Sequence, residues 1–314
     1  MKARLVAAVA ASLLATTLAA SPAGAQTNIT SWVSNGGDNA NPCSFDEPCA
    51  SFGRALDTVS VGGTIRCLDT LNSQSAITVT KSATIDCTEH PVVIRVGAST
   101  LTINAPDGIV MLRGFSLGSL SPNTPSVRVT QAAAAHLDNV LIRDSGGPGI
   151  LVVPTAGLVR LYIGNSIVAR NGVVNANPGI RIAPTGAASV QLVLHNVEMV
   201  GNYRGIEVAA TGTTAGNSLT IRNSMIVGSI ENAINADSGA NALNIMIEES
   251  TITNNVRGII VSGAGTSIRV GRSNISSNGT AFFAAAGATI RSYRNNQINL
   301  NSSNGTPLPQ ETLQ

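Results

Sequence analysis

Three stretches of the chain share one ten-residue pattern: LTIRNSMIVG at residues 219–228, IMIEESTITN at 245–254 and IRVGRSNISS at 268–277. In each stretch, apolar residues alternate with polar ones on both sides of a central corner residue. A period of two places the apolar side chains on one face of a strand. The stretches start 26 and 23 residues apart, a spacing typical of a repeat architecture rather than of a single folded sheet.

The same pattern recurs along most of the chain at intervals of 25, 26, 31, 27, 26, 23 and 23 residues. Its corner residues are Gly114, Asn139, Asn165, Asn196, Asn223, Glu249, Arg272 and Asn295. Two residues before each corner stand Leu112, Leu137, Ile163, Leu194, Ile221, Ile247, Val270 and Tyr293, which we expect to point inward. Three residues after it stand Leu117, Ile142, Val168, Met199, Ile226, Ile252, Ile275 and Ile298. Asn suits a tight turn and can bond its stacked neighbours, so the pattern predicts an Asn ladder at this corner.

A further short strand follows each corner and usually begins with Gly-Ile, as at residues 149–152, 179–182, 205–208 and 258–261. One such coil cannot bury its apolar face alone, but stacked coils share a continuous core. Leucine-rich repeats have a shorter unit and propeller blades a longer one. The pattern therefore predicts an all-β, right-handed parallel β-helix of about nine to ten coils over residues 64–298.

Residues 1–25 resemble an export signal, with Lys2 and Arg4 before an apolar run and Ala23-Gly24-Ala25 as a cleavage site. A retained membrane anchor is the alternative, but the run is short for one. These two cations account for the excess of 19 basic over 17 acidic residues, so the rest of the chain is neutral. Neutrality disfavours nucleic acid as a partner, and no later stretch is long enough to span a membrane. We expect a secreted or periplasmic protein, with association with the cell surface as a further alternative.

Residues 26–63 are expected to form an amino-terminal cap. All four cysteines lie at or near it, and the simplest of three disulfide pairings joins Cys43 to Cys49 and Cys67 to Cys87. A zinc site is the alternative, although paired C-x-x-C units are absent. An amphipathic helix is expected over residues 51–59, stopped by Gly62-Gly63. Residues 299–314 form a polar tail that we expect to be disordered, with a short cover over the last coil as the alternative.

The amino-terminal part also carries a family resemblance. Residues 41–43, 48–52, 62–65 and 80–86 (NPC, PCASF, GGTI and TKSATID) resemble the opening of exported bacterial parallel β-helix proteins of the pectin-lyase-like superfamily. The resemblance covers residues 30–300 and implies the β-helix fold. It implies little about function, because the superfamily includes lyases, hydrolases, esterases, epimerases, tailspikes and adhesins.

The chain lacks the catalytic motifs that this resemblance would lead one to seek. Galacturonan hydrolases of the superfamily carry Asn-Thr-Asp, paired aspartates and Gly-His-Gly, none of which occurs here. Pectate lyases use a calcium site of several aspartates, whereas Asp138 and Asp144 stand nearly alone on their coil. We therefore expect neither a metal nor a cofactor, and the missing motifs favour a non-enzymatic protein over a polysaccharide lyase or glycoside hydrolase.

One outward column holds the remaining catalytic candidates: His195, Arg222 and Glu248 at equivalent positions of three successive coils, with Glu198 just beyond the corner. A His beside carboxylates could act as a general acid or base. The simpler interpretation, which we favour, is a surface ladder of alternating charge. A neighbouring outward column of Met111, Tyr162, Val193 and Met246 is expected to be covered by loops.

A second outward column runs through Arg95, Arg128, Leu151, Arg181 and Glu207 on the Gly-Ile strands. Arginines along one ridge could bind the carboxylates or sulfates of an acidic glycan, and Tyr203-Arg204 adds a ring for sugar stacking. A solvated face with Arg181 paired to Glu207 is the alternative. The predicted function is binding of an extracellular or cell-surface polysaccharide. A lyase or hydrolase acting on an acidic glycan, a structural or adhesive rod, and a tailspike-like trimer are the other hypotheses.

Overall fold

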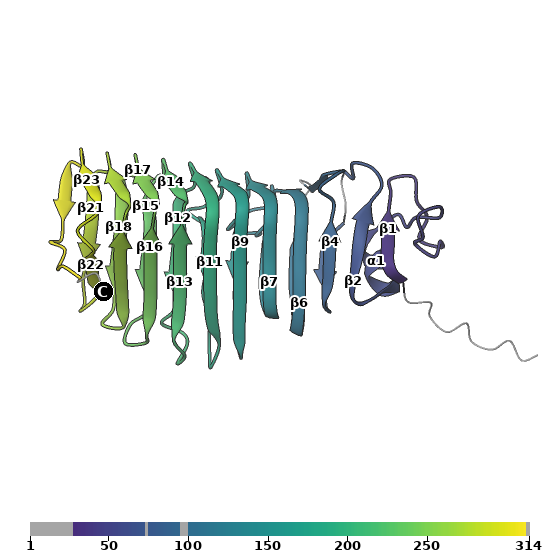
Figure 1. Ribbon diagram of the computed structural model, residues 1–314, viewed down its shortest axis with the longest axis horizontal. Helices are drawn as coiled ribbons and strands as arrows, with labels where there is room; N and C mark the ends of the chain where they lie inside the picture. The colour runs from purple at the N-terminus through teal and green to yellow at the C-terminus, as the bar shows by residue number, and fades with distance from the viewer. Residues whose placement is uncertain (1–27, 73–74, 95–99, 312–314) are drawn as a thin grey trace, which may run out of the picture.

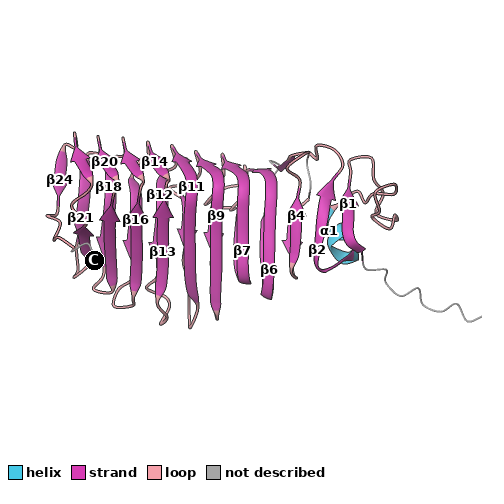
Figure 2. Ribbon diagram, in the orientation of Figure 1, coloured by secondary structure: helices cyan, strands magenta, loops and turns pink. Residues whose placement is uncertain are grey.

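The protein folds into a rod of stacked β-coils (Figure 1). This computed structural model describes residues 28–72, 75–94 and 100–311. The expected export signal and Arg95 lie outside these residues. Strands run through almost the whole rod, and α1 (Phe52–Thr58) lies at its amino-terminal end (Figure 2). The strands stack in parallel over about nine turns, which confirms the predicted parallel β-helix.

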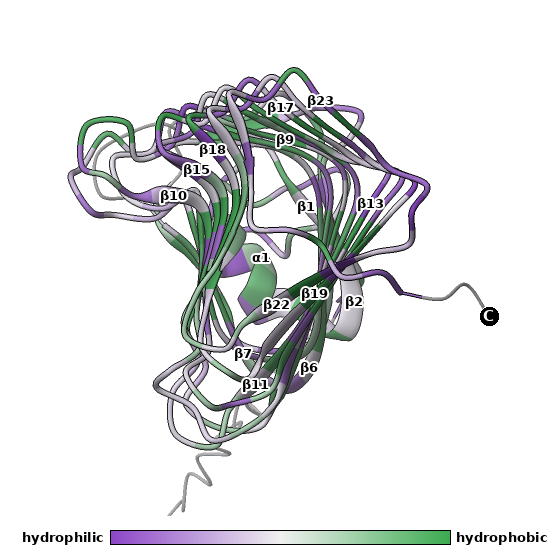
Figure 3. Ribbon diagram, turned by 90° about the vertical axis from the view of Figure 1, so that its left-hand side faces the viewer, coloured by the Kyte–Doolittle hydropathy of each residue, from purple (hydrophilic) through white to green (hydrophobic). Residues whose placement is uncertain are grey.

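Three parallel sheets form the walls of the rod, as the view along its axis shows (Figure 3). Four long strands bend through more than one sheet: β6 (Leu101–Leu117), β7 (Val127–Arg143), β9 (Leu158–Ala169) and β11 (Ser189–Val200). Sheet I combines parts of these with β1 (Asn28–Val33), β2 (Val59–Cys67), β4 (Ala83–Asp86), β13 (Asn217–Arg222), β16 (Leu243–Glu248), β19 (Thr266–Gly271) and β22 (Thr289–Ser292). Sheet II adds β5 (Val92–Ile94), β14 (Met225–Val227), β17 (Thr251–Thr253), β20 (Asn274–Ser276) and β23 (Gln297–Asn299). Sheet III adds β3 (Ile77–Val79), β8 (Ile150–Val152), β10 (Pro178–Ile182), β12 (Arg204–Ala209), β15 (Asn232–Asp237), β18 (Arg257–Ser262), β21 (Thr280–Ala284) and β24 (Ser303–Gly305).

The predicted inward residues form the core of sheets I and II. Up to the coil that contains Arg272, each is at most 2% exposed. The prediction fails on the last coil, where Ser292 rather than Tyr293 pairs with Val270 and occupies the inward position. At this position the tail, rather than another coil, lies beside the inward residue, and Ser292 pairs with Gln310.

The predicted corner between sheets I and II is confirmed by its backbone. Positive φ angles of 47–74° occur at the first seven predicted corner residues, from Gly114 to Arg272. On the last coil this conformation belongs to Arg294 rather than Asn295. The expected Asn ladder forms in part: Asn196 donates to Asn165 at 2.9 Å, and Asn165 donates to Asp138 at 2.8 Å. Asn favours this conformation more than most residues do, which explains its frequency here.

A second, buried Asn ladder was not predicted and lies at the corner between sheets II and III. Asn255 donates to Asn278 at 3.0 Å, and Asn278 donates to Asn301 at 3.1 Å. These amides also bond main-chain groups of neighbouring coils, as Asn278 does with the carbonyl of Ile252 at 3.0 Å. The ladder thereby satisfies polar main-chain groups where the chain turns inside the wall of the rod.

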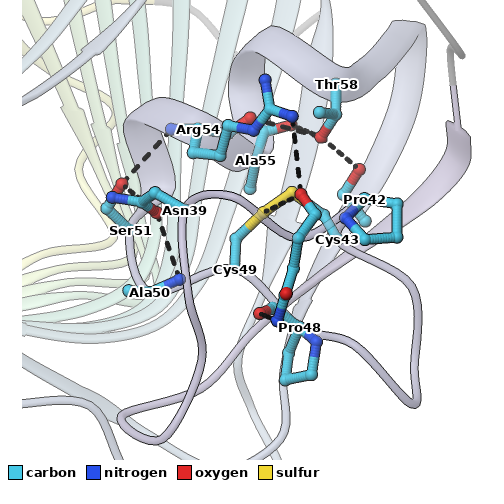
Figure 4. Close-up of a disulfide and its surroundings, with 12 residues drawn as sticks. Asn39, Pro42, Cys43, Pro48, Cys49, Ala50, Ser51, Arg54, Ala55 and Thr58 are labelled. Carbon is cyan, nitrogen blue, oxygen red and sulfur yellow. Dashed lines mark hydrogen bonds between the residues drawn. A yellow bond between two sulfur atoms is a disulfide. The ribbon is translucent and has the colours of Figure 1, made fainter.

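The amino-terminal cap closes one end of the core. Both predicted disulfides are present, Cys43–Cys49 and Cys67–Cys87. Figure 4 shows the first of them beside α1, where Ser51 caps the helix by accepting from the Arg54 amide at 3.3 Å.

The helix ends within one residue of the expected position, but the stop expected at Gly62-Gly63 was wrong. It stops at Thr58, and Gly62-Gly63 lie inside strand β2. Parallel pairing of β1 with β2 also brings the first coil into the segment expected to be cap.

The tail lies against the last coil as far as it is described. Ser292 donates its amide to Pro309 at 3.0 Å, and Glu311 donates its amide to Ser292 at 2.9 Å. The Glu311 carboxylate also pairs with Arg269 and Arg291, each at 3.3 Å. This arrangement favours the short cover over the expected disorder for residues 299–311.

Candidate functional site

The ridge on sheet III is the first candidate surface. Its strand register places Arg128, Leu151, Arg181 and Glu207 at equivalent outward positions of four successive coils, and we call this set the arginine ridge. The structure therefore confirms this part of the predicted column. It corrects the start, because the coil before Arg128 presents Thr102 at this position rather than Arg95. The loops vary in length here, so counting residues back from Arg128 misplaces that coil.

Five side chains form a continuous ion-pair network across the ridge. Arg181 contacts Glu207 at 3.2 Å, and Glu207 contacts Arg204 at 2.6 Å. Arg204 also contacts Glu231 at 2.6 Å, and Glu231 contacts Arg257 at 3.0 Å. The members come from β10, β12, the turn before β15 and the start of β18, so the network ties four coils together.

Glu231 and Arg257 were missed by sequence reasoning. The available signal was the coil interval, which sets Arg257 26 residues after Glu231. Glu231 precedes its strand and Arg257 begins its strand, so neither belongs to the Gly-Ile pattern that marks the sheet III strands.

Arg204 is the centre of this network. Burial lowers the pKa of its guanidinium, but hydrogen bonds and charge from Glu207 and Glu231 outweigh burial and hold that pKa above its ordinary value. Arg204 also stacks on the Tyr203 ring, 5.4 Å from its centroid. Contacts with Glu207, Glu231 and Tyr203 thus hold the Arg204 guanidinium in place. This arrangement suits a residue that orders the neighbouring side chains more than one that binds a ligand itself.

Arg128 differs from the other arginines of the ridge. It is exposed and is absent from the ion pairs formed among the described residues. Arg128 and the network together contain four guanidinium groups and two carboxylates. This side of an almost neutral protein therefore carries a local excess of positive charge.

The predicted catalytic column lies on sheet I and behaves as a charge ladder. The register aligns Arg113, Asp138, Gly164, His195, Arg222 and Glu248 on successive coils. Arg113 contacts Asp138 at 3.5 Å, and Arg222 contacts Glu248 at 2.9 Å. Glu248 also pairs with Arg272.

The four catalytic candidates do not converge. His195 pairs with no carboxylate among the described side chains. Glu198 lies beyond the Asn196 corner on sheet II, in register with Met225, so it faces a different direction. The arrangement favours the charge ladder over an acid–base site.

The apolar column on sheet I is interrupted, and its residues are half-buried except for the exposed Val193. His136 lies between Met111 and Tyr162, and Thr220 lies between Val193 and Met246. Val193 is 36% exposed, and the expected cover by loops was therefore wrong for this part of the face.

Among the described residues, no helix is both long and apolar enough to cross a membrane. In the same ranges, no three His, Cys, Asp or Glu side chains gather as a metal site would require.

Comparison with known proteins identifies the fold. No protein-family model and no curated protein sequence matches the chain. Among solved structures, pectate lyase Pel9A superposes with a TM-score of 0.65 at 13% sequence identity, over 91% of this chain and 79% of that one. A rhamnogalacturonan lyase gives a TM-score of 0.43 at 10% identity, over 89% and 88% of the two chains. The chain therefore has the parallel β-helix fold that it shares with pectate lyase Pel9A.

Proposed function

We propose that the protein is an exported rod that binds an acidic polysaccharide along the arginine ridge and does not cleave it. The observation that carries this proposal is the local excess of guanidinium groups around Arg128 and Arg181. Guanidinium forms paired hydrogen bonds with carboxylate and sulfate groups. Arg128 and Arg181 lie two coils apart along the rod, so one polysaccharide chain that runs along the ridge can contact both.

The state of the carboxylates supports binding rather than cleavage. Glu207 lies between Arg181 and Arg204, and Glu231 lies between Arg204 and Arg257. A general acid or base needs an oxygen that can reach the proton of the substrate. Here the guanidinium groups occupy the oxygens of both carboxylates. The hydrolase hypothesis, which needs free carboxylates, therefore has less support at this ridge than the binding hypothesis.

The proposed location outside the cytosol has two supports. Residues 1–25 have the composition of an export signal, and the four cysteines form two disulfides. Disulfides of this kind persist in oxidising compartments.

The test is affinity electrophoresis of the purified protein in gels that contain polygalacturonate, alginate or chondroitin sulfate. We expect retardation in at least one gel, and a loss of at least tenfold in affinity for the double variant Arg128→Ala/Arg181→Ala. The matched control, Arg222→Ala/Arg272→Ala, removes the same charge from the sheet I side and should retain binding. Equal losses in both variants, or no retardation in any gel, would contradict the proposal. Release of unsaturated sugar ends would contradict the absence of cleavage.

A structural rod is the second candidate, and the ion pairs that join successive coils favour it. Such pairs occur on sheet I between Arg222 and Glu248 and on sheet III between Arg204 and Glu231. A purely structural role predicts that none of the three gels retards the protein.

A further inference from the structure

The ring of Tyr162 lies over a glycine on sheet I, away from the arginine ridge. Tyr162 lies two residues before Gly164 on β9, and its ring covers that glycine. A Cβ atom on Gly164 would come within 2.7 Å of Cε1 and 2.9 Å of Oη of Tyr162. The ladder of charged side chains is interrupted at this glycine, between Asp138 and His195. The missing side chain leaves room for the ring to lie against the strand, and the Tyr162 side chain is half-buried.

Polar groups surround this ring. His136 occupies the equivalent position on the preceding coil, with 5.9 Å between the two ring centroids. His195 is in register with Gly164 on the following coil. Arg160 and Gln191 are exposed and in register with each other. They lie on the same face as the ring, two residues before Tyr162 and Val193 respectively. Arg160, like Arg128, is absent from the ion pairs among the described residues.

The surroundings of the ring are open as well as polar. Val193, the next residue in the column of Tyr162, is 36% exposed, and Ile109 at the edge of the face is 56% exposed. Among the described residues, the tail contacts this face near the last coil, through Glu311 with Arg269 and Arg291. A flat ring supported from below, with hydrogen-bonding groups at its rim, matches what a hexopyranose presents: an apolar C–H face edged by hydroxyl groups.

We propose that Tyr162 is the platform of a second carbohydrate site, which binds a hexopyranose of a neutral polysaccharide. The C–H face of the sugar stacks on Tyr162. Arg160 and Gln191 bind hydroxyl groups on one side, and His195 binds them on the other. The site needs no charge on the sugar, because stacking and neutral hydrogen bonds provide the contacts. It is therefore separate from the arginine ridge in both position and ligand.

Substitution of Gly164 tests the role of the Tyr162 ring directly. Gly164→Ala places a methyl group where the ring now lies, so it displaces Tyr162 while retaining every side chain of the site. The obstacle is the end of a mobile side chain rather than main chain, so the variant is expected to fold. Gly271→Ala is the matched control, because its Cβ would lie 3.0 Å from Cδ2 of Tyr293 on another coil. Tyr162→Phe retains the ring and should bind nearly as the parent protein does.

The experiment is affinity electrophoresis of the full protein in gels of hydroxyethylcellulose, xyloglucan or galactomannan. We expect at least one gel to retard the parent protein. Tyr162→Ala and Gly164→Ala should each lose at least tenfold in affinity, while Gly271→Ala should lose none. Unchanged circular dichroism shows that the variants fold.

The inference is overturned if none of the neutral polysaccharides retards the parent protein, or if Tyr162→Ala and Gly164→Ala bind as it does. The Arg128→Ala/Arg181→Ala variant should retain neutral binding. Failure of this site and failure of the arginine ridge therefore give different results.

Discussion

Glu207→Gln should weaken the fold and strengthen glycan binding, and these opposite effects make it the most informative substitution. The Glu207 side chain is only 10% exposed and neutralises Arg181 and Arg204. An amide keeps its size but removes the charge. Arg181, which is 40% exposed, is then free to pair with an acidic sugar.

The magnitudes follow from these contacts. One exposed guanidinium–carboxylate pair contributes about 0.5–1 kcal/mol, which predicts affinity about two- to fivefold higher for an acidic polysaccharide. Two charge-assisted contacts to a mostly buried carboxylate are lost, so the free energy of unfolding should fall by about 2 kcal/mol. The gain in affinity should shrink as salt is raised, because the new pair is solvent-exposed.

Isothermal titration with an acidic oligosaccharide, at low and at moderate salt, measures the first effect, and urea denaturation measures the second. Glu249→Gln is the matched control: it removes the same charge from a side chain that is 48% exposed and pairs with Arg272 at another corner. Weaker binding by Glu207→Gln would refute the reasoning, as would an equal gain in Glu249→Gln. If the parent protein cleaved a polysaccharide and Glu207→Gln did not, Glu207 would instead have a catalytic role.

Three further predictions concern the fold. Asn278→Ala removes four hydrogen bonds, including one from the Asn255 amide at 3.1 Å, and should lower the free energy of unfolding by about 3–4 kcal/mol in urea titrations. Asn223→Gly, at an exposed corner with a φ of 47°, should change the free energy of unfolding by less than about 0.5 kcal/mol. Similar losses in the Asn278 and Asn223 variants would show that the buried Asn ladder does not stabilise the fold. Burial raises the pKa of Asp86, but hydrogen bonds from Thr88 and charge from Arg113 and Arg66 outweigh it and lower that pKa. The ionised group therefore stabilises the fold above the ordinary carboxyl pKa of about 3.9, and this contribution disappears as the pH falls through the lowered value. Asp86→Asn should cost about 1 kcal/mol at pH 7 and little near pH 2, as thermal melts at the two pH values can show.

The regular part of the fold could be predicted because one physical rule repeats in every coil. Inward residues such as Leu194 and Ile221 must be apolar and alternate with exposed ones, so a single register fits every coil except the last. The corner conformation selects Asn for a local reason, which is visible without knowledge of the neighbouring coils. The two disulfides follow from four cysteines close together in the chain.

Contacts between coils were harder to predict, because they depend on the loops. The coil that precedes Arg128 presents Thr102 rather than Arg95, since the length of chain between coils varies. The Glu231–Arg257 pair joins residues near strand starts, where no alternation marks them. The Tyr162 platform depends on where a ring lies relative to Gly164, which a pattern of residue types does not specify. Sequence thus predicted the walls of the rod better than the chemistry on its surface.

The most direct test of the central claim is the affinity of the parent protein and of Arg128→Ala/Arg181→Ala for one acidic polysaccharide, measured side by side with Arg222→Ala/Arg272→Ala. The account predicts that the parent protein and the Arg222/Arg272 variant bind alike, and that the Arg128/Arg181 variant binds at least tenfold more weakly. An equal affinity for all three proteins would contradict it.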